Sequence, residues 1–293
     1  SEGMDIKETL NITAEMLKVK GACASGMRDF LKEFPREQYP EGADYQKVLN
    51  RCAEHKRPDY AEWLVQAFGA TNTTLSVDRI NTDGNVFFAG RIEARGEIKC
   101  KMIIAGRGIK AGEGIKAGEG IEAGEGIEAG EGIEAGEDIE AGWGIKAGWG
   151  IEAGEGIKTG EGIKTNGVIN AGWGIKVGWG IEVGCGIEAG DGIEAGEYIK
   201  AGWGIKAGDG IEAGEYIEAG EGIRAGWGIE AGEYIKAGCG IEAGCGIEAG
   251  EYIKAGWGIE AGCGIEAGEY IKAGEDFGVY AGLAVRLSYK SRD

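Results

Sequence analysis

Residues 251–268 have the sequence EYIKAGWGIEAGCGIEAG, which consists of three near-copies of one six-residue unit. Each copy keeps Ile, Ala and Gly in fixed places, while the slot two residues before the isoleucine holds Glu, Trp or Cys. Isoleucine recurs with the same spacing from Ile109 to Ile271 without a gap. A short unit repeated over many copies is typical of a solenoid, in which each coil stacks on the next.

A column of tyrosines indicates the length of one coil. Six residues could form half of a twelve-residue coil or a third of an eighteen-residue coil. Five tyrosines directly precede an isoleucine at intervals of eighteen residues, namely Tyr198, Tyr216, Tyr234, Tyr252 and Tyr270. An eighteen-residue coil places all five on one face, whereas a twelve-residue coil would alternate them between opposite faces. The spacing therefore predicts three short strands per coil and roughly ten coils.

The unit Ile-Lys/Glu-Ala-Gly-x-Gly resembles the repeat of hexapeptide-repeat parallel β-helix proteins over roughly residues 90–280. The resemblance implies a mainly β fold, a parallel β-solenoid, with a small inward-facing residue two places before each isoleucine. In this sequence that slot holds Glu113, Trp143, Asp191 or Cys239 in different copies. Because a column of unpaired carboxylates cannot lie in an apolar core, we expect the slot to face water while Ile and Ala point inward. We expect the glycines to supply corner angles that other residues resist.

The residues before the repeat predict a small all-α domain. Apolar side chains recur at helical spacing in residues 25–34, 43–55 and 57–69, and residues 6–19 leave room for an earlier helix. Ser25 is an expected N-cap, Pro58 suits a first turn and Gly69 suits a C-terminal cap. The head resembles helical segments of uncharacterised bacterial and phage-related proteins through Gly21-Ala22-Cys23 and Arg57-Pro58-Asp59-Tyr60 with Trp63-Leu64. That resemblance implies no activity.

The chain divides into four parts. We expect a helical head and N-terminal cap in residues 1–70, the first strands of the solenoid in 71–108, the regular solenoid in 109–276 and a C-terminal cap in 277–293. Caps are expected because the end of a solenoid exposes unpaired strand edges. Ile103 can shift the frame between an earlier isoleucine series and the regular one, and Phe277 is expected at the core position after Ile271.

Acidic side chains are concentrated in the repeat. Residues 107–276 hold 33 acidic and 13 basic side chains, whereas the rest of the chain holds 17 and 18. On an eighteen-residue coil, the face that contains Ile121 and Ile265 has a net charge of −11. Its outward glutamates are Glu122, Glu140, Glu194, Glu212, Glu230, Glu248 and Glu266. Such a strip costs self-repulsion that a purely structural rod has no need to accept, although solubility alone would also explain it.

The residue types in the repeat argue against an enzyme. Hexapeptide-type solenoids often belong to acyltransferases or zinc carbonic anhydrases, which use histidine as a general base or metal ligand. The chain has one histidine, His55, and it lies in the head. Seven cysteines without a CxxC pair indicate free thiols in a reducing compartment, while the spacing of Cys245 and Cys263 leaves a thiol site as an alternative. We expect no catalytic residue, no metal and no cofactor.

Aromatic residues supply the rest of the candidate binding surface. Besides the five tyrosines, these are Trp143, Trp149, Trp173, Trp179, Trp203, Trp227 and Trp257. Exposed tryptophan is enriched at interfaces, although these rings could instead shield glycine corners. The sequence predicts a cytoplasmic, non-enzymatic scaffold for protein interaction. The alternatives are a DNA-mimic inhibitor of a nucleic-acid-binding protein, or a structural or assembly component. We expect a protein partner and no direct binding to nucleic acid or membrane, and leave self-association open.

Overall fold

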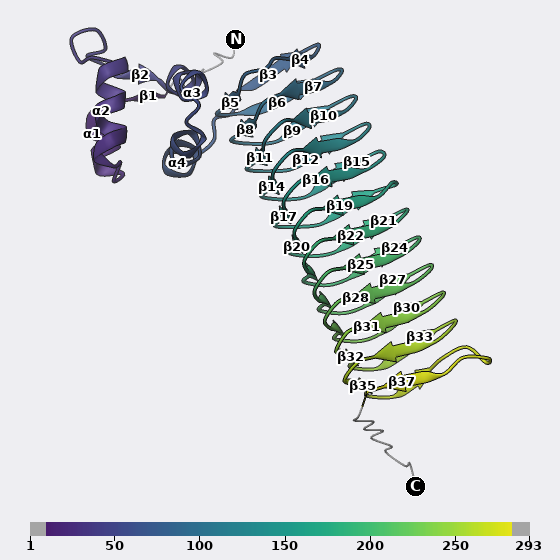
Figure 1. Ribbon diagram of the computed structural model, residues 1–293. Helices are drawn as coiled ribbons and strands as arrows, with labels where there is room; N and C mark the ends of the chain where they lie inside the picture. Colours follow the sequence, from purple (N-terminus) through teal and green to yellow (C-terminus); the bar gives the residue numbers. More distant parts are fainter. Residues whose placement is uncertain (1–9, 283–293) are drawn as a thin grey trace, which may run out of the picture.

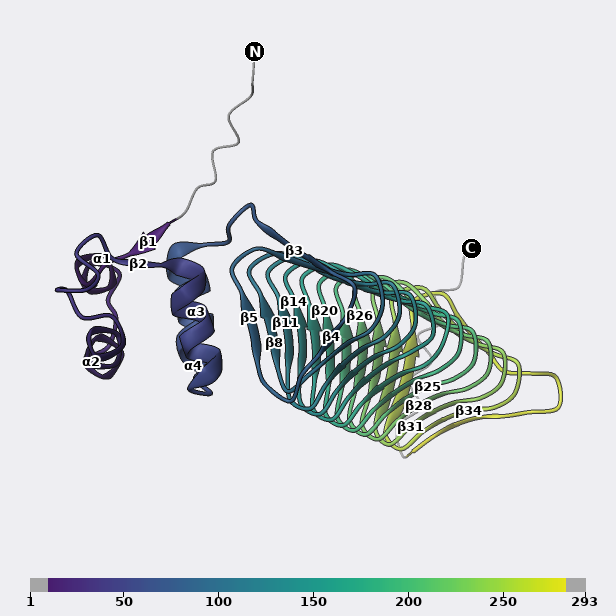
Figure 2. The same cartoon turned by 90° about the horizontal axis from the view of Figure 1, so that it is seen from above.

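The computed structural model describes residues 10–282, and it contains a helical head followed by a long rod of stacked strands (Figure 1). Seen from above, successive coils of the rod lie one behind another and the head lies beside its first coils (Figure 2). The predicted fold class is confirmed, because the strands form a parallel solenoid with about eighteen residues per coil after a small helical region.

Within the described residues, three parallel sheets run along the rod, and each complete coil contributes one strand to each sheet. Sheet 1 contains β3 (Thr74–Val77), β6 (Arg91–Ala94), β9 (Ile109–Ala111), β12 (Ile127–Ala129), β15 (Ile145–Ala147), β18 (Ile163–Thr165), β21 (Ile181–Val183), β24 (Ile199–Ala201), β27 (Ile217–Ala219), β30 (Ile235–Ala237), β33 (Tyr252–Ala255) and β36 (Tyr270–Lys272). Sheet 2 contains β4 (Ile80–Asn81), β7 (Ile98–Cys100), β10 (Ile115–Ala117), β13 (Ile133–Ala135), β16 (Ile151–Ala153), β19 (Ile169–Ala171), β22 (Ile187–Ala189), β25 (Ile205–Ala207), β28 (Ile223–Ala225), β31 (Ile241–Ala243), β34 (Ile259–Ala261) and β37 (Val279–Ala281). Sheet 3 contains β5 (Val86–Phe88), β8 (Ile103–Ala105), β11 (Ile121–Ala123), β14 (Ile139–Ala141), β17 (Ile157–Thr159), β20 (Ile175–Val177), β23 (Ile193–Ala195), β26 (Ile211–Ala213), β29 (Ile229–Ala231), β32 (Gly246–Ala249) and β35 (Gly264–Ala267).

The register of the sheets explains the constant isoleucine and alanine. Ile127 pairs with Ile109 and Ile145, and Ala129 pairs with Ala111 and Ala147, so identical residues stack into columns. Isoleucine and alanine point inward and are buried, while the residue between them points outward, as the alternation of side chains along a strand requires. The first strands complete further coils, so the rod has about twelve coils instead of the expected ten.

The frame change falls at the expected place. Ile103 pairs with Ile121 and is fully buried, while the adjacent Ile104 takes the outward position beside Glu122. At the other end, the expectation for Phe277 is wrong. Val279 pairs with Ile259, because the turn before β37 is longer than in the regular coils, and Phe277 is exposed and stacks on Trp257 with ring centroids 6.0 Å apart. Residues 283–293 of the expected C-terminal cap lie outside the described residues.

The glycines of the rod allow the coils to stack closely. The expectation that they supply special backbone angles is wrong. Within the described residues, the glycines with positive φ are Gly21, Gly42 and Gly69, all outside the rod. At Gly190, three places after Ile187, an added Cβ would lie 1.9 Å from the carbonyl oxygen of Gly172 in the preceding coil. Such contacts recur along the rod, so this glycine is fixed because the coils leave no room for a side chain.

The head contains four helices, which are α1 (Ala14–Val19), α2 (Ala24–Glu33), α3 (Tyr45–Glu54) and α4 (Pro58–Phe68), and a short antiparallel pair, β1 (Asn11–Ile12) and β2 (Ala43–Asp44). Pro58 opens α4 and Gly69 ends it, as predicted. The predicted N-cap at Ser25 is wrong, because the N-cap is Cys23, two residues earlier, and its thiol accepts the amide hydrogen of Gly26. None of the four helices is both long and apolar enough to cross a lipid bilayer.

The head docks on the side of the first coils through α3 and α4 (Figure 1). Phe87 and Ile104 take outward positions that carry charged residues in later coils, and both are buried in the apolar core of the head. The side chain of Gln46 donates to the carbonyl of Phe87 and accepts from the amide of Ala89, so it satisfies the free edge of β5. The head therefore covers one side of the rod and one strand edge.

Candidate functional site

The slot two residues before each isoleucine lies at a corner of the coil and faces water. All seven tryptophans of the rod are between 53% and 68% exposed, which excludes a place in the core. Trp149, Trp203 and Trp257 occupy the corner that leads into sheet 2, and Trp173 and Trp227 occupy the corner that leads into sheet 3. Sheet 2 is therefore bordered by exposed indoles along both edges.

The tyrosines form one continuous stack on sheet 1. Neighbouring rings lie 4.9–5.3 Å apart and are within 10° of parallel. They replace the second glycine of the unit, which otherwise forms the floor of a groove beside each strand. On sheet 1 the groove has a volume of about 650 Å³ and ends at Tyr198, where the stack begins. Burial among neighbours raises the pKa of Tyr234 to about 12, so this ring stays neutral and contributes mainly through packing.

Most columns of outward side chains alternate in charge and form ion pairs between coils. On sheet 2, Lys206 bonds Glu188 at 2.6 Å, and the guanidinium of Arg224 lies 2.8 Å from Glu242. Sheet 1 has similar pairs, such as Lys236 with Glu218 at 2.9 Å. Because opposite charges face each other across the strand pairs, these columns stabilise the stack modestly.

In one region of the rod two adjacent columns of glutamates run side by side without such pairing, and we call it the acidic stripe. It consists of Glu212, Glu230, Glu248 and Glu266 on sheet 3 and Glu197, Glu215, Glu233, Glu251 and Glu269 at the corner between sheets 3 and 1. Among the residues that the structure describes, none of the nine forms an ion pair, and all nine are exposed. The corner glutamates stack directly, with the amide of Glu233 2.7 Å from the carbonyl of Glu215.

The acidic stripe borders a groove on sheet 3. This groove has a volume of about 990 Å³, and its floor is made by the second glycine of successive units, such as Gly210 and Gly228. Trp227 and Cys245 are among its lining residues, as are the four sheet 3 glutamates of the stripe, and farther along the groove Lys158 and Lys176 also line it. The arrangement can accept an elongated, positively charged group that lies along the rod and also contacts an indole ring.

Replacing Glu230 by lysine should stabilise the rod. Glu230 stacks between Glu212 and Glu248, and like charges directly opposite each other destabilise a strand pair. We expect the E230K variant to raise the melting temperature by about 1–3 °C at low ionic strength, and we expect molar salt to abolish the gain. The matched variant E188K removes a pair with Lys206 and should lower the melting temperature, as measured by circular dichroism. Equal shifts for the two variants would show that the stripe carries no excess repulsion.

One glutamate of the predicted acidic face, Glu122, lies against the docked head instead of on the open surface, while Glu140 stays exposed and pairs with Lys158. Glu122 is partly covered by α4, and the pKa of its carboxyl is raised to about 7, first by burial and then by the carboxylates of Glu62 and Glu140, while Lys158 opposes the shift. Burial and the nearby Asp59 also raise the pKa of Glu62. The head therefore docks against a site where carboxylates face one another.

This junction predicts that docking depends on pH. A carboxyl group whose pKa is raised in the folded state favours that state when protonated, so its contribution is lost as the pH rises from about 4.3 to about 7. We expect the docking of α4 to weaken by about 1–2 kcal/mol between pH 5 and pH 8. The E122Q variant should show little of this loss, as measured by hydrogen exchange in α4 after correction for the intrinsic exchange rate. A wild-type protein with equal protection at both pH values would contradict the prediction.

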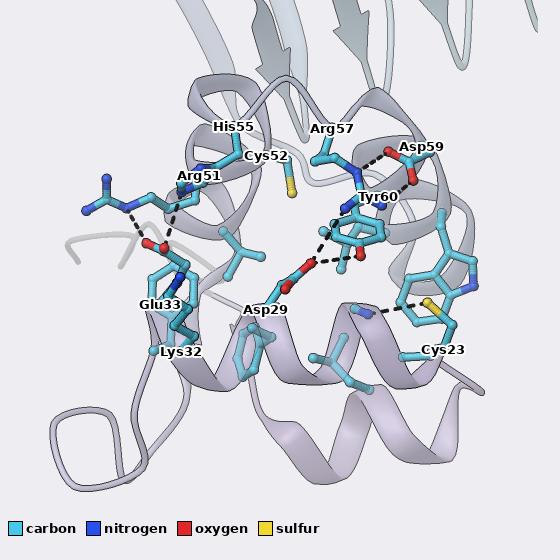
Figure 3. Close-up of a pocket in the computed structure, with 18 of the residues that line it drawn as sticks. Cys23, Asp29, Lys32, Glu33, Arg51, Cys52, His55, Arg57, Asp59 and Tyr60 are labelled. Atoms are coloured by element: carbon cyan, nitrogen blue, oxygen red, sulfur yellow. Dashed lines mark hydrogen bonds and ion pairs between the residues drawn. The ribbon is translucent and has the colours of Figure 1, made fainter.

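The head contains a cleft between α2 and the pair α3–α4 (Figure 3). Its volume is about 490 Å³, and apolar side chains such as Phe30, Val48 and Leu64 form its floor. A charged rim surrounds the floor, and its members pair across the helices. Its ion pairs and hydrogen bonds join Arg51 and His55 to Glu33, Arg57 to Asp29 and Asp59, and Tyr60 to Asp29. The cleft is an apolar hollow whose charges are already neutralised.

Arg57 is the most constrained group of this rim. Its guanidinium donates two hydrogen bonds to Asp59, at 2.8 and 2.6 Å, and lies 3.3 Å from the centre of the Tyr60 ring. The bonds from Arg57 lower the pKa of Asp59. Sequence reasoning missed this cleft. The sequence did contain a signal for the charged rim. Asp29 and Glu33 are four residues apart in α2, and Arg51 and His55 are four residues apart at the end of α3, so each pair lies on one helix face.

The predicted thiol alternative corresponds to a close pair. Cys245 and Cys263 lie at the same corner of adjacent coils, with their Sγ atoms 2.7 Å apart. Cys52 and Cys100 are buried, which raises the pKa of each thiol to about 12. Within residues 10–282, no group of three or more His, Cys, Asp or Glu side chains is placed to hold a metal ion.

Comparison with known proteins adds information on the head. Residues 4–71 match the family model described as the YdhT N-terminal domain. This segment contains all four helices and the cleft, and it stops before the first strand of the solenoid. No curated protein and no solved structure matches the chain.

Proposed function

We propose that this chain is a non-enzymatic scaffold for protein interaction, in which the acidic stripe binds a basic surface of a partner protein. The observation that carries the proposal is the unpaired state of the stripe. On sheet 2 the chain places Lys206 beside Glu188 and Arg224 beside Glu242, so the repeat tolerates pairing, yet the nine glutamates of the stripe have no cationic partner in the described residues. A basic partner would supply the missing charges and relieve the repulsion between stacked carboxylates.

The tryptophan residues would give such a partner its second type of contact. Trp227 borders the groove beside the stripe, and more than half of its side chain is exposed. A lysine or arginine side chain that pairs with the stripe can place its aliphatic stem or its cationic group against an indole ring. This combination favours a basic peptide or protein over a simple cation. The free thiols fit a cytoplasmic setting, and the six-residue spacing fits a hexapeptide-type solenoid.

Charge spacing favours a DNA mimic as the second candidate. Each of the two glutamate columns repeats once per coil, about every 4.8 Å, so together they place one charge about every 2.4 Å along the rod. Duplex DNA carries one charge about every 1.7 Å. A protein that binds DNA through its phosphates could accept the stripe in place of a duplex.

A binding experiment with a basic probe tests the proposal. Poly-L-lysine binding would be measured by fluorescence anisotropy over a range of salt concentrations, for the wild-type protein and two triple variants. The first variant, E212Q/E230Q/E248Q, neutralises the stripe, and the second, E134Q/E188Q/E242Q, neutralises three paired glutamates of sheet 2. We expect at least about a tenfold loss of affinity for the first variant and less than about a threefold loss for the second. Equal losses would show that only net charge matters and would contradict a role for the stripe.

A competition experiment separates the two candidates. The rod would be added to a complex of duplex DNA with a basic architectural DNA-binding protein. Release of the DNA by the wild-type protein, but not by E212Q/E230Q/E248Q, would favour the DNA mimic. Retention of the DNA despite binding of poly-L-lysine would favour a scaffold for a different class of protein.

A further inference from the structure

Cys245 and Cys263 are two stacked cysteines near the end of the rod, and their thiols are in contact. The two residues occupy the corner that leads into sheet 3 in adjacent coils, and the amide of Cys263 donates to the carbonyl of Cys245 at 2.7 Å. The thiol of Cys245 donates to the Sγ atom of Cys263 across 2.7 Å. Cys263 is exposed and Cys245 is half-buried, so small molecules in solution can reach the pair.

We propose that Cys245 and Cys263 form a reversible disulfide that joins the last two coils of the rod. The backbone spacing permits this bond, because paired strands place stacked Cα atoms about 4.8 Å apart, within the range of about 4.4–6.8 Å found in disulfides. The sulfur atoms must approach by less than about 1 Å to reach a bond length of about 2.05 Å. The inference does not depend on the proposed binding function.

The reaction with a small disulfide such as oxidised glutathione is balanced. The thiolate of Cys263 attacks one sulfur of oxidised glutathione, forms a mixed disulfide and releases one glutathione thiolate. The thiolate of Cys245 then attacks the Sγ atom of Cys263 and releases the second glutathione. The two protein thiols lose two protons and two electrons, and oxidised glutathione is reduced to two thiols. Cys263 is the expected first nucleophile because it is the more exposed residue and accepts the hydrogen bond from Cys245.

Cys185 and Cys239 cannot form such an internal disulfide with each other. Cys185 and Cys239 share a different corner but are three coils apart, with Trp203 and Glu221 between them. Their separation along the rod is about 14 Å, which no disulfide can span. The thiol of Cys185 donates to the carbonyl of Asn166. Among these four cysteines of the repeat, the stacked pair near the end of the rod is therefore the one expected to form an internal disulfide.

The bond would act where the stack has the least support. A coil in the middle of a solenoid contacts two neighbours, whereas coils near an end contact fewer and open more readily. A disulfide that closes a loop of eighteen residues restricts this opening. An oxidant would thus stabilise the final coils without changing the rest of the rod.

Mass spectrometry and hydrogen exchange on the full chain test the proposal. The reduced C23S/C185S/C239S variant, which lacks the other accessible thiols, would be incubated with oxidised glutathione, and its intact mass should fall by about 2 Da with no added glutathione. Proteolysis should yield a linked peptide pair that contains Cys245 and Cys263. Hydrogen exchange in residues 259–267 should slow by at least about tenfold on oxidation, and residues 109–135 should be unaffected.

Two variants keep the test selective. C23S/C185S/C239S retains the pair and should form the same internal link, with the same slowing of exchange, as the wild-type protein. C245S should instead add one glutathione at Cys263 and show no slowing of exchange. Separate glutathione adducts on both cysteines, or a covalent dimer in place of the internal link, would overturn the proposal.

Discussion

Replacing Gly190 by alanine is expected to disrupt the rod at that coil, while the same change at Gly192 should be tolerated. An added Cβ at Gly190 would lie 1.9 Å from the carbonyl oxygen of Gly172, and this oxygen belongs to the backbone, so it cannot move aside without opening the stack. The displacement would also strain the bond from the amide of Gly190 to the carbonyl of Ala171. We expect a loss of at least about 3 kcal/mol in local stability.

Gly192 is the matched control because it lies in the same corner, on the other side of Asp191. An added Cβ there would lie 3.4 Å from the carbonyl oxygen of Gly210, which is an ordinary contact. Alanine also reduces the freedom of the unfolded chain, so the G192A variant should be neutral or stabilised by up to about 1 kcal/mol. Chemical denaturation and hydrogen exchange in the neighbouring coils would measure both effects. Similar losses for G190A and G192A would refute the role assigned to close stacking.

The sequence itself supports this distinction between the two glycines. Between Gly106 and Gly274, the position three places after each isoleucine departs from glycine once, at Asn166. There the following residue is Gly167, and its added Cβ would lie 1.4 Å from the carbonyl oxygen of Trp149, so the close approach has moved by one residue. By contrast, the position directly before isoleucine, which Gly192 occupies, is variable. It holds tyrosine in five copies of the unit, Asp138 in another and Val168 in another.

The coil length was predictable because a periodic property was visible in the sequence. The eighteen-residue spacing of the tyrosines has one simple structural explanation, and the stacked rings confirm it. The outward direction of the corner slot was predictable from electrostatics, because carboxylates such as Glu113 cannot stack in an apolar core. The role of glycine was not predictable, because it depends on distances between coils that are far apart along the chain.

The candidate surface could be predicted only in part. The sequence placed Glu122 and Glu140 on an open acidic face, but the head covers part of this face, and such long-range docking leaves no periodic signal. A local signal was present at Phe87 and Ile104, which are apolar where later coils have charged residues. An apolar residue at an outward position indicates that something covers it. The unpaired state of the stripe also needed the structure, because it depends on which columns are adjacent.

Replacing Ile104 by glutamate is expected to release the head without unfolding the rod. Glutamate is the usual outward residue of the unit, and Glu122 takes the equivalent place in the next coil, so the strand itself should accept the change. Ile104 is 1% exposed beneath the head, however, and a carboxylate buried there would have no cationic partner. Burial of an unpaired charge costs several kcal/mol, so we expect the loss of at least about 3 kcal/mol of docking free energy. Hydrogen exchange should show faster exchange in α3 and α4 and unchanged protection from β11 onward.

The matched control is N81E, which introduces the same charge at an exposed outward position of the first coil. Asn81 pairs with Lys99 in register, so a glutamate there faces water and a cation, and the head should remain docked. If N81E released the head as well, the effect of I104E would come from charge at the first coils and not from burial beneath the head. If I104E left α3 and α4 protected, the apolar contacts of Ile104 would contribute little, and Gln46 with its two bonds to β5 would have to hold the head on the rod. The Q46A variant in the I104E background would then release the head, because it leaves the carbonyl of Phe87 and the amide of Ala89 without a partner.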